Sequence, residues 1–228
     1  MLITVEQALD AEQLASLKAL LQGAGEAWVD GRVTAGHQGA PVKSNQQIAE
    51  GSPVAAQARS IVLGALERHP VFISAALPNQ VYPPMFNRYG VGMGFGPHVD
   101  GGVRLHPLTG AKLRTDVSAT LFLSHPDDYD GGELEIIDTY GAHAVKLAAG
   151  DLLLYPASSL HQVTPVTRGE RLACFFWIQS LVRDEGQRSL LYEMDGALQR
   201  LAATGAEVEA RRTLVGCYHN LLRQWAET

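Results

Sequence analysis

A histidine and an aspartate lie two positions apart in a glycine-rich stretch, GPHVDGG, at residues 96–102. If the backbone is extended there, the side chains of His98 and Asp100 point to the same face. An imidazole and a carboxylate on one face can both reach a single metal ion, with each donor atom about 2 Å from it. The pair alone does not decide between a metal site and a polar turn at the end of a strand.

Two further polar residues stand at strand boundaries in the segment 151–182, DLLLYPASSLHQVTPVTRGERLACFFWIQSLV. His161 follows a short polar loop, and by itself it is compatible with a hydrogen-bonded residue at a strand end. Arg171 opens a strongly apolar run, where a guanidinium is costly to bury unless it is paired. Its partner is either an internal carboxylate or the carboxylate of a ligand, which a planar guanidinium binds with two hydrogen bonds.

Together these residues form a pattern that three classes of protein can use. Two histidines and one carboxylate on one face of an octahedral metal are the facial triad of non-haem Fe(II) oxygenases. A zinc hydrolase could hold a metal-bound water with the same residues, but no glutamate stands next to either motif to serve as its general base. A metal-binding β-barrel with a sensory role in iron homeostasis needs no carboxylate anchor, so Arg171 favours the oxygenase.

The elements that must position these residues are short β-type runs between residues 71 and 183. Turn-forming residues separate the runs, and no ten-residue helical period interrupts them. Many short strands with tight turns predict a sandwich or barrel and not a parallel α/β sheet. The predicted strands are VFISAAL, MFNRYGV, DVSATLFLS, ELEII, HAVKL, DLLLYP and RLACFFWIQSLV.

Helical patterns occupy both ends of the chain. The N-terminal stretch MLITVEQALDAEQLASLKALL predicts a helix, with Asp10 as N-cap and Gln13 at the capping-box position. Ser52 and Pro53 predict the start of a second helix, because serine caps well and proline loses no needed N–H at the first position. Apolar residues at helical spacing predict one or two more helices after residue 184. We therefore expect an N-terminal helical segment packed on the core (1–77), a core (78–183) and a C-terminal helical module (184–228).

The composition of the chain indicates which partners and which cellular compartment to expect. The formal net charge is −6 and no Lys/Arg run reaches four residues, so we expect no nucleic-acid partner. No apolar run approaches the roughly 18–20 residues that span a bilayer, and we expect a cytoplasmic protein without a membrane partner. Cys174 and Cys217 both have apolar sequence neighbours and are predicted to be buried free thiols. The apolar C-terminal helices could support a homo-oligomer.

The sequence resembles the Fe(II)/2-oxoglutarate-dependent dioxygenases of the prolyl-4-hydroxylase-like branch. More closely it resembles the bacterial PKHD-type hydroxylases, a group associated with iron uptake. The resemblance covers most of residues 80–183 and implies a mainly β fold with flanking helices and a double-stranded β-helix (jelly roll) core. It rests on FNRYGVGMGFGPHVDGG, RTDVSATLFLSHPDDYDGGELEI and AGDLLLYPASSLHQVTPVTRGERLACFFWIQS.

The resemblance also implies roles for single residues. His98, Asp100 and His161 would be the iron ligands, and Arg171 would bind the distal carboxylate of 2-oxoglutarate. Tyr89 would lie near that co-substrate, although a tyrosine nine residues before the first ligand could equally belong to the core. The implied cofactors are Fe(II), 2-oxoglutarate as co-substrate with O2, and ascorbate as reductant.

The implied reaction is hydroxylation of a C–H bond with release of succinate and CO2. The substrate is left open between a small molecule, such as a siderophore or an amino acid, and a peptidyl residue, because one fold hosts many substrates. The alternative is a non-catalytic sensor that binds the metal and 2-oxoglutarate in iron homeostasis.

A long polar segment, GGVRLHPLTGAKLRTD, follows the first two candidate ligands at residues 101–116. We expect it to form a mobile loop over the mouth of the site, and a solvated surface loop is the alternative. The candidate substrate contacts on it are Arg104, His106, Lys112 and Arg114.

Overall fold

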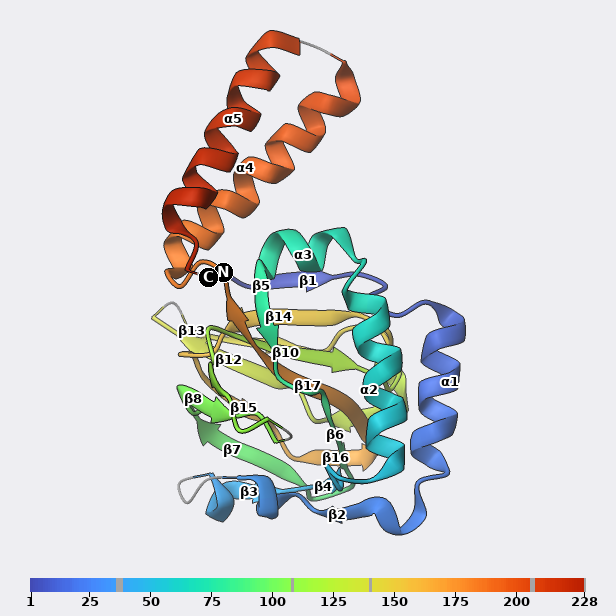
Figure 1. Cartoon of the computed structure of the whole chain (residues 1–228). Helices are drawn as coiled ribbons and strands as arrows, with labels where there is room; N and C mark the ends of the chain where they lie inside the picture. The colour runs from blue at the N-terminus through green and yellow to red at the C-terminus, as the bar shows by residue number, and fades with distance from the viewer. Residues whose placement is uncertain (36–38, 108, 140, 206–207, 228) are drawn as a thin grey trace.

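The computed structural model describes residues 1–35, 39–107, 109–139, 141–205 and 208–227. Two antiparallel sheets face each other, helices cover the outer side of the larger sheet, and a helical hairpin projects from one end (Figure 1). The helices are α1 (Ala11–Gln22), α2 (Pro53–Leu66), α3 (Pro70–Ala76), α4 (Glu185–Thr204) and α5 (Val208–Trp225).

The larger sheet has the strand order β1-β14-β10-β17-β6-β4-β2, with β5 paired to β17. Its interior strand β10 is buried along its whole length, because α1 and α2 cover one face and the second sheet covers the other. Its residues therefore alternate between two buried environments: Val117, Ala119 and Leu121 belong to the apolar core cluster, whereas Ser118 and Thr120 line the cavity between the sheets. The strands are β1 (Ile3–Val5), β2 (Trp28–Asp30), β4 (Gln46–Ile48), β5 (Pro78–Val81), β6 (Met85–Tyr89), β10 (Val117–Phe122), β14 (Leu152–Pro156) and β17 (Arg171–Ser180).

The smaller sheet has the strand order β13-β12-β15-β7-β3. Its strands are β3 (Lys43–Ser44), β7 (Gly94–His98), β12 (Leu134–Asp138), β13 (Gly141–Val145) and β15 (Leu160–Val163). Two short ribbons flank it, β8 (Val103–Leu105) with β9 (Lys112–Arg114) and β11 (Tyr129–Gly131) with β16 (Val166–Gly169). A second apolar cluster, which includes Tyr89, Phe122 and Tyr155, fills the space between the sheets. The predicted jelly-roll core with flanking helices is confirmed.

Both predicted helix starts are present. The Asp10 carboxylate accepts a hydrogen bond from the Gln13 backbone N–H at 2.8 Å, and the Gln13 side chain accepts one from the Asp10 N–H at 3.0 Å. The Ser52 hydroxyl accepts from the Ala55 N–H at 3.1 Å, with Pro53 opening α2. The helical prediction is wrong before Asp10, because Ile3–Val5 form the edge strand β1, which pairs with β14.

The predicted strand VFISAAL is also wrong, because these residues lie mostly in α3. Pro70 opens this helix, and Phe72, Ala75 and Ala76 fall on one buried helical face. Leu77 ends the helix with a positive φ of 43°. Strand β5 then begins at Pro78, directly after the helix.

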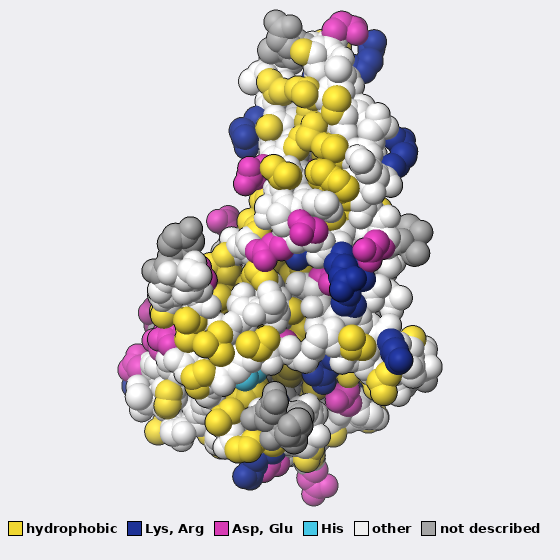
Figure 2. Space-filling model, turned by 90° about the vertical axis from the view of Figure 1, so that its left-hand side faces the viewer, with side chains coloured by type: hydrophobic (Ala, Val, Ile, Leu, Met, Phe, Trp, Pro, Cys, Tyr) yellow, Lys and Arg dark blue, Asp and Glu magenta, His cyan; other side chains and the backbone are white. Residues whose placement is uncertain are grey.

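The C-terminal helices α4 and α5 form a hairpin whose base packs on the body. Leu77, Val182 and Leu191 are buried at this base. Hydrophobic side chains continue outward along the hairpin (Figure 2). The large exposed hydrophobic residues of the two helices are Leu190, Val208, Leu214 and Val215. None of the helices in the described ranges is long and apolar enough to cross a membrane.

The two cysteines differ in their surroundings. Cys174 is a buried free thiol on β17, as predicted, and burial raises its pKa. Cys217 is a free thiol but exposed, so the prediction that it is buried is wrong. Its apolar sequence neighbours gave the wrong answer because α5 projects past the body, and part of its apolar surface stays uncovered.

Candidate metal centre and co-substrate pocket

His98 at the end of β7 and His161 on β15 are paired in register across the two antiparallel strands. Their ring centroids are 4.2 Å apart. The Nδ1–H of His98 donates to the Gly96 carbonyl at 2.8 Å, and that of His161 donates to the Ser159 carbonyl at 3.0 Å. These bonds fix the tautomer of both rings and leave each Nε2 lone pair free for a metal ion.

Asp100 completes a group of three possible metal ligands. Its Oδ2 atom is 3.7 Å from Nε2 of His161 and accepts a hydrogen bond from the Ser118 hydroxyl on β10 at 2.6 Å. One ligand atom from each of His98, Asp100 and His161 lies within 4.8 Å of the other two. Small rotations of the side chains would bring donor atoms at this spacing to about 2 Å from one ion. The structure thus brings together the three residues predicted from the sequence.

The surroundings of His98 favour the neutral imidazole, which is the form that binds metal. Burial lowers the pKa of His98 to about 4, and the neighbouring His161 contributes in the same direction. Phe95 stacks on the His98 ring with a centroid distance of 3.6 Å, and the Tyr155 ring meets His161 edge-on at 5.2 Å. Aromatic rings therefore shield both imidazoles from water.

Arg171, at the start of β17, lies inside the jelly roll with only 1% of its surface exposed. Its Nε and Nη2 atoms have no hydrogen-bond partner. Its guanidinium carbon is 5.4 Å from the ring centroids of both Tyr89 and Phe122. No carboxylate of the described residues lies within ion-pair distance of it, so an internal counter-ion is not found. A buried guanidinium with unused donors has the charge and the hydrogen-bonding capacity to pair with an anion.

Tyr89 is the register partner of Arg171, on the adjacent strand β6. It is fully buried and belongs to the cluster between the sheets, yet it also lines the same cavity as Arg171. Burial raises the pKa of its phenol, which therefore keeps its proton at neutral pH. Its hydroxyl is 3.4 Å from Nδ2 of Asn87, whose Oδ1 has no partner. The two interpretations of Tyr89, as a core residue and as a neighbour of the co-substrate site, are thus compatible.

One cavity of about 790 Å³ reaches from the three possible metal ligands to Arg171, and its lining includes the exposed side chains of Val99, Val103 and Leu105. Figure 2 looks onto this side, where a histidine is visible among hydrophobic side chains. The segment 101–116 borders the opening through the β8–β9 ribbon; Leu108 lies outside the described residues.

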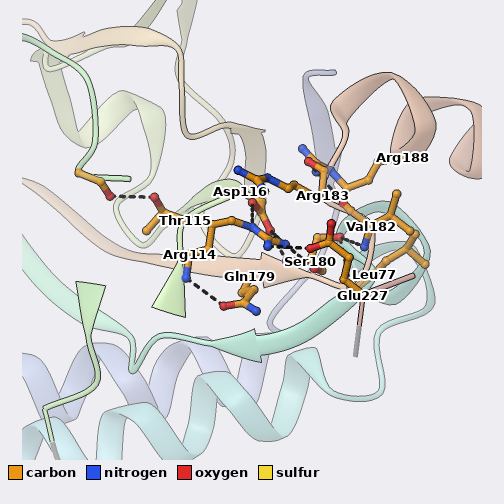
Figure 3. Close-up of polar contacts among 11 residues, drawn as sticks. Leu77, Arg114, Thr115, Asp116, Gln179, Ser180, Val182, Arg183, Arg188 and Glu227 are labelled. Atoms are coloured by element: carbon orange, nitrogen blue, oxygen red, sulfur yellow. Dashed lines mark hydrogen bonds and ion pairs between the residues drawn. The ribbon is translucent and has the colours of Figure 1, made fainter. Parts of the chain in front are cut away.

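The four candidate substrate contacts on that segment have different positions. Arg104 lines the cavity, whereas His106 and Lys112 are absent from its lining. Arg114 lies elsewhere, in ion pairs with Asp116 at 2.7 Å and with Glu227 at 2.8 Å (Figure 3). Arg114 therefore connects the ribbon at the cavity mouth to the C-terminal end of the chain.

Three residues of the site were not predicted from the sequence. Ser118 holds Asp100, Tyr155 contacts His161, and Lys43 enters the cavity from β3. Ser118 and Tyr155 are single polar groups in predicted strands, and Lys43 follows an irregular glycine-rich segment. Ser118 and Tyr155 stand in stretches that carry the family resemblance, but no spacing links either of them to the candidate ligands, and Lys43 stands in no motif at all.

Comparison with known proteins assigns the chain to a family. The 2OG-Fe(II) oxygenase superfamily matches residues 84–179, and the PKHD-type hydroxylase C-terminal domain matches residues 185–227. A PKHD-type hydroxylase of Cupriavidus metallidurans is 70% identical over 228 residues, which is 100% of both chains. Another, from Beijerinckia indica, is 56% identical over 227 residues, again 100% of both. The chain belongs to the PKHD-type hydroxylase family.

PKHD-type hydroxylases carry a 2OG-Fe(II) oxygenase domain, so this chain is an oxidoreductase of the dioxygenase class, and Fe(II) and 2-oxoglutarate are the cofactor and co-substrate that the family implies. Solved structures share its fold. A Pseudomonas putida prolyl-4-hydroxylase is similar with a TM-score of 0.55 and 24% identity, over 78% of this chain and 92% of that one. A prolyl hydroxylase from Trichoplax adhaerens gives a TM-score of 0.58 and 15% identity, over 83% and 86%.

Proposed function

We propose that this PKHD-type hydroxylase binds Fe(II) through His98, Asp100 and His161, anchors 2-oxoglutarate on Arg171, and hydroxylates a C–H bond of its substrate. The observation that carries the proposal is the buried guanidinium of Arg171, whose Nε and Nη2 atoms lack partners in the cavity that the three ligands share. A protein that only bound a metal would have no use for a second site, suited to an anion, at that place.

The donor set fits the proposed groups. Two imidazoles and a carboxylate suit Fe(II) with positions left open, and Arg171 suits the distal carboxylate of 2-oxoglutarate. When bound, the two together supply the O2-dependent oxidation that releases succinate and CO2.

Other residues of the chain would orient the metal ligands and keep water away from the co-substrate. The carbonyls of Gly96 and Ser159 orient the two imidazoles, and the Ser118 hydroxyl orients Asp100. The rings of Tyr89 and Phe122 beside Arg171 exclude water, which strengthens the ion pair with a bound carboxylate. Tyr89 keeps its phenolic proton and can donate it in a hydrogen bond to the same carboxylate.

We also propose the domain boundaries 1–77, 78–183 and 184–228. The family matches at 84–179 and 185–227 support the second boundary in particular, since they divide where β17 ends and α4 begins.

Turnover tests the proposal and separates it from a non-catalytic sensor. Purified protein with Fe(II), 2-oxoglutarate, ascorbate and O2 is incubated with siderophores, amino acids, peptides and cell extracts. We expect substrate-dependent succinate release and a product heavier by one oxygen in mass spectrometry, both lost in His161→Ala. A protein that binds iron and 2-oxoglutarate but releases no succinate under any of these conditions would instead be a sensor.

A further inference from the structure

Two cations enter the cavity outside the proposed iron and 2-oxoglutarate positions. The first is Lys43 on β3, which is only 6% exposed. Its Nζ donates to the Thr34 hydroxyl at 3.1 Å and lies 5.2 Å from the Phe95 ring and 5.8 Å from the Phe175 ring. No carboxylate of the described residues lies within 4 Å of it. A buried ammonium with one neutral hydrogen-bond partner recovers only a small part of the hydration free energy that it loses on burial.

The second cation is Arg104 on β8, at the mouth of the cavity. Its guanidinium carbon is 4.0 Å from the Trp177 ring centroid and 5.1 Å from that of Tyr82. These rings hold the guanidinium by cation–π contact, and no carboxylate within the described ranges pairs with it. Burial lowers the pKa of Lys43, and the charge of Arg104 is the next largest cause. The two cations are therefore close enough to repel each other.

The proposed function gives a role to only some of the charged side chains that line the cavity. Among the described lining residues, the Lys, Arg and Asp side chains are Lys43, Asp100, Arg104 and Arg171. Asp100 is assigned to iron and Arg171 to 2-oxoglutarate, and the remaining two are both positive. The cavity volume of about 790 Å³ falls within the range of roughly 300–1,000 Å³ that holds a drug-sized ligand. There is therefore room for a second molecule beside a co-substrate as small as 2-oxoglutarate.

We infer that the substrate carries a carboxylate bound by Lys43 and Arg104, with an apolar face against Phe175 and Trp177. This inference rests on the proposed function, which assigns the other two charges. A carboxylate would supply the counter-ion that both cations lack, and the aromatic wall would bury the adjoining apolar part of the substrate. The subsite would select acids over neutral compounds of the same shape, whether the carboxylate belongs to a small molecule or to a peptide.

Matched acids and amides test this selection. Full-length protein is loaded with Zn(II), which is diamagnetic, and with saturating 2-oxoglutarate, so that Arg171 is occupied. Binding is followed by ligand-observed NMR for 3-phenylpropionate against 3-phenylpropionamide, and for the peptide Ac-Phe-Asp-NH2 against Ac-Phe-Asn-NH2. We expect the acid of at least one pair to bind about 10-fold or more tightly than its amide. The pair with the larger difference identifies the source of the carboxylate.

Variants of Lys43 and Arg104 test whether these two residues cause the preference for the acid. Lys43→Met and Arg104→Gln should each remove most of the preference for the acid. Lys43→Arg keeps the positive charge and should therefore keep the preference. Arg104 lies on a partly exposed ribbon, so its variant does not depend on repacking the interior. Lys112→Met, an exposed lysine on the facing strand β9, is the matched control and should keep the wild-type preference.

Equal binding of acid and amide by the wild type, or an unchanged preference in the Lys43→Met/Arg104→Gln double variant, would overturn the inference. If the proposed function itself were wrong, the result would be different, because 2-oxoglutarate would then not bind in the same samples. Displacement of bound 2-oxoglutarate by the acid would place the acid on Arg171, which also overturns the inference.

Discussion

Arg171 and Tyr89 face each other in register on β17 and β6, with the guanidinium carbon 5.4 Å from the centre of the phenol ring. The pair lines the cavity with a cation whose Nε and Nη2 donors have no partner and a phenol that keeps its proton. A buried wall of this kind is suited to holding a carboxylate away from water. The first prediction concerns this wall.

Arg171→Met should remove the anion site while keeping a long side chain in the interior. We expect the affinity for 2-oxoglutarate to fall by about 100-fold or more, since breaking a buried charged pair costs about 3–5 kcal/mol. Metal affinity should stay unchanged. Isothermal titration calorimetry of 2-oxoglutarate into the Zn(II)-loaded protein measures this.

The control is Arg168→Met, which removes an exposed arginine that pairs with Asp130 on the neighbouring ribbon. It should bind 2-oxoglutarate as the wild type does. If both variants bound it with wild-type affinity, Arg171 would not be the anchor.

Ser118→Ala should loosen Asp100, because the hydroxyl donates the 2.6 Å hydrogen bond that orients this carboxylate. Loss of such a supporting bond typically lowers metal affinity about 10- to 100-fold. Titration with Co(II), followed by its visible absorption, measures the change. Ser189→Ala, which removes a hydroxyl bonded to a backbone carbonyl on α4, serves as control. A wild-type Co(II) affinity in Ser118→Ala would show that Asp100 needs no such support.

Gly132→Ala should destabilise the protein and disturb the anion site. Gly132 has a φ of +65°, and an added Cβ would lie 3.1 Å from Cδ of Arg171 and 3.0 Å from Cγ2 of Val166. The backbone strain alone costs about 1–3 kcal/mol, and each kcal/mol lowers Tm by about 2–4 °C in a chain of this size. The control Gly102→Ala meets no atom within 4 Å and should leave Tm almost unchanged. Equal melting temperatures for the two variants would contradict the described geometry.

Stability should depend on pH through Lys43, whose pKa burial lowers from 10.5 to about 8. Between these two values the unfolded chain keeps a proton that the folded protein has lost, so the free energy of unfolding rises with pH. Relative to Lys43→Met, the wild type should gain up to about 3 kcal/mol between pH 8 and 10.5. Urea unfolding of the metal-free protein at several pH values measures this difference, and Lys112→Met should show none. A wild-type advantage that fell with pH would have the wrong sign.

The sequence predicted the metal-binding side of the site well because its residues stand at strand ends in recognisable motifs. His98, Asp100, His161 and Arg171 do lie around one cavity. Helix starts were also predictable where capping is local, as at Asp10 and Ser52, because the bonds that define them span only three residues.

Other features depend on partners far away in the sequence. The three residues of β1 form a strand only because β14, about 150 residues later, offers them an edge. The exposed position of Cys217 follows from where the hairpin projects, which a helical period does not reveal. Lys43 and Arg104 share a cavity through the packing of separate strands, and no motif links them.

The most direct test of the central claim is the visible absorption spectrum of anaerobic protein with Fe(II) and 2-oxoglutarate. Chelation of Fe(II) by 2-oxoglutarate at the proposed ligands should give a metal-to-ligand charge-transfer band. The band should be absent in His161→Ala and should require much higher 2-oxoglutarate concentrations in Arg171→Met. If the wild-type protein gave no such band under these conditions, the assignment of His98, Asp100, His161 and Arg171 to an oxygenase site would be wrong.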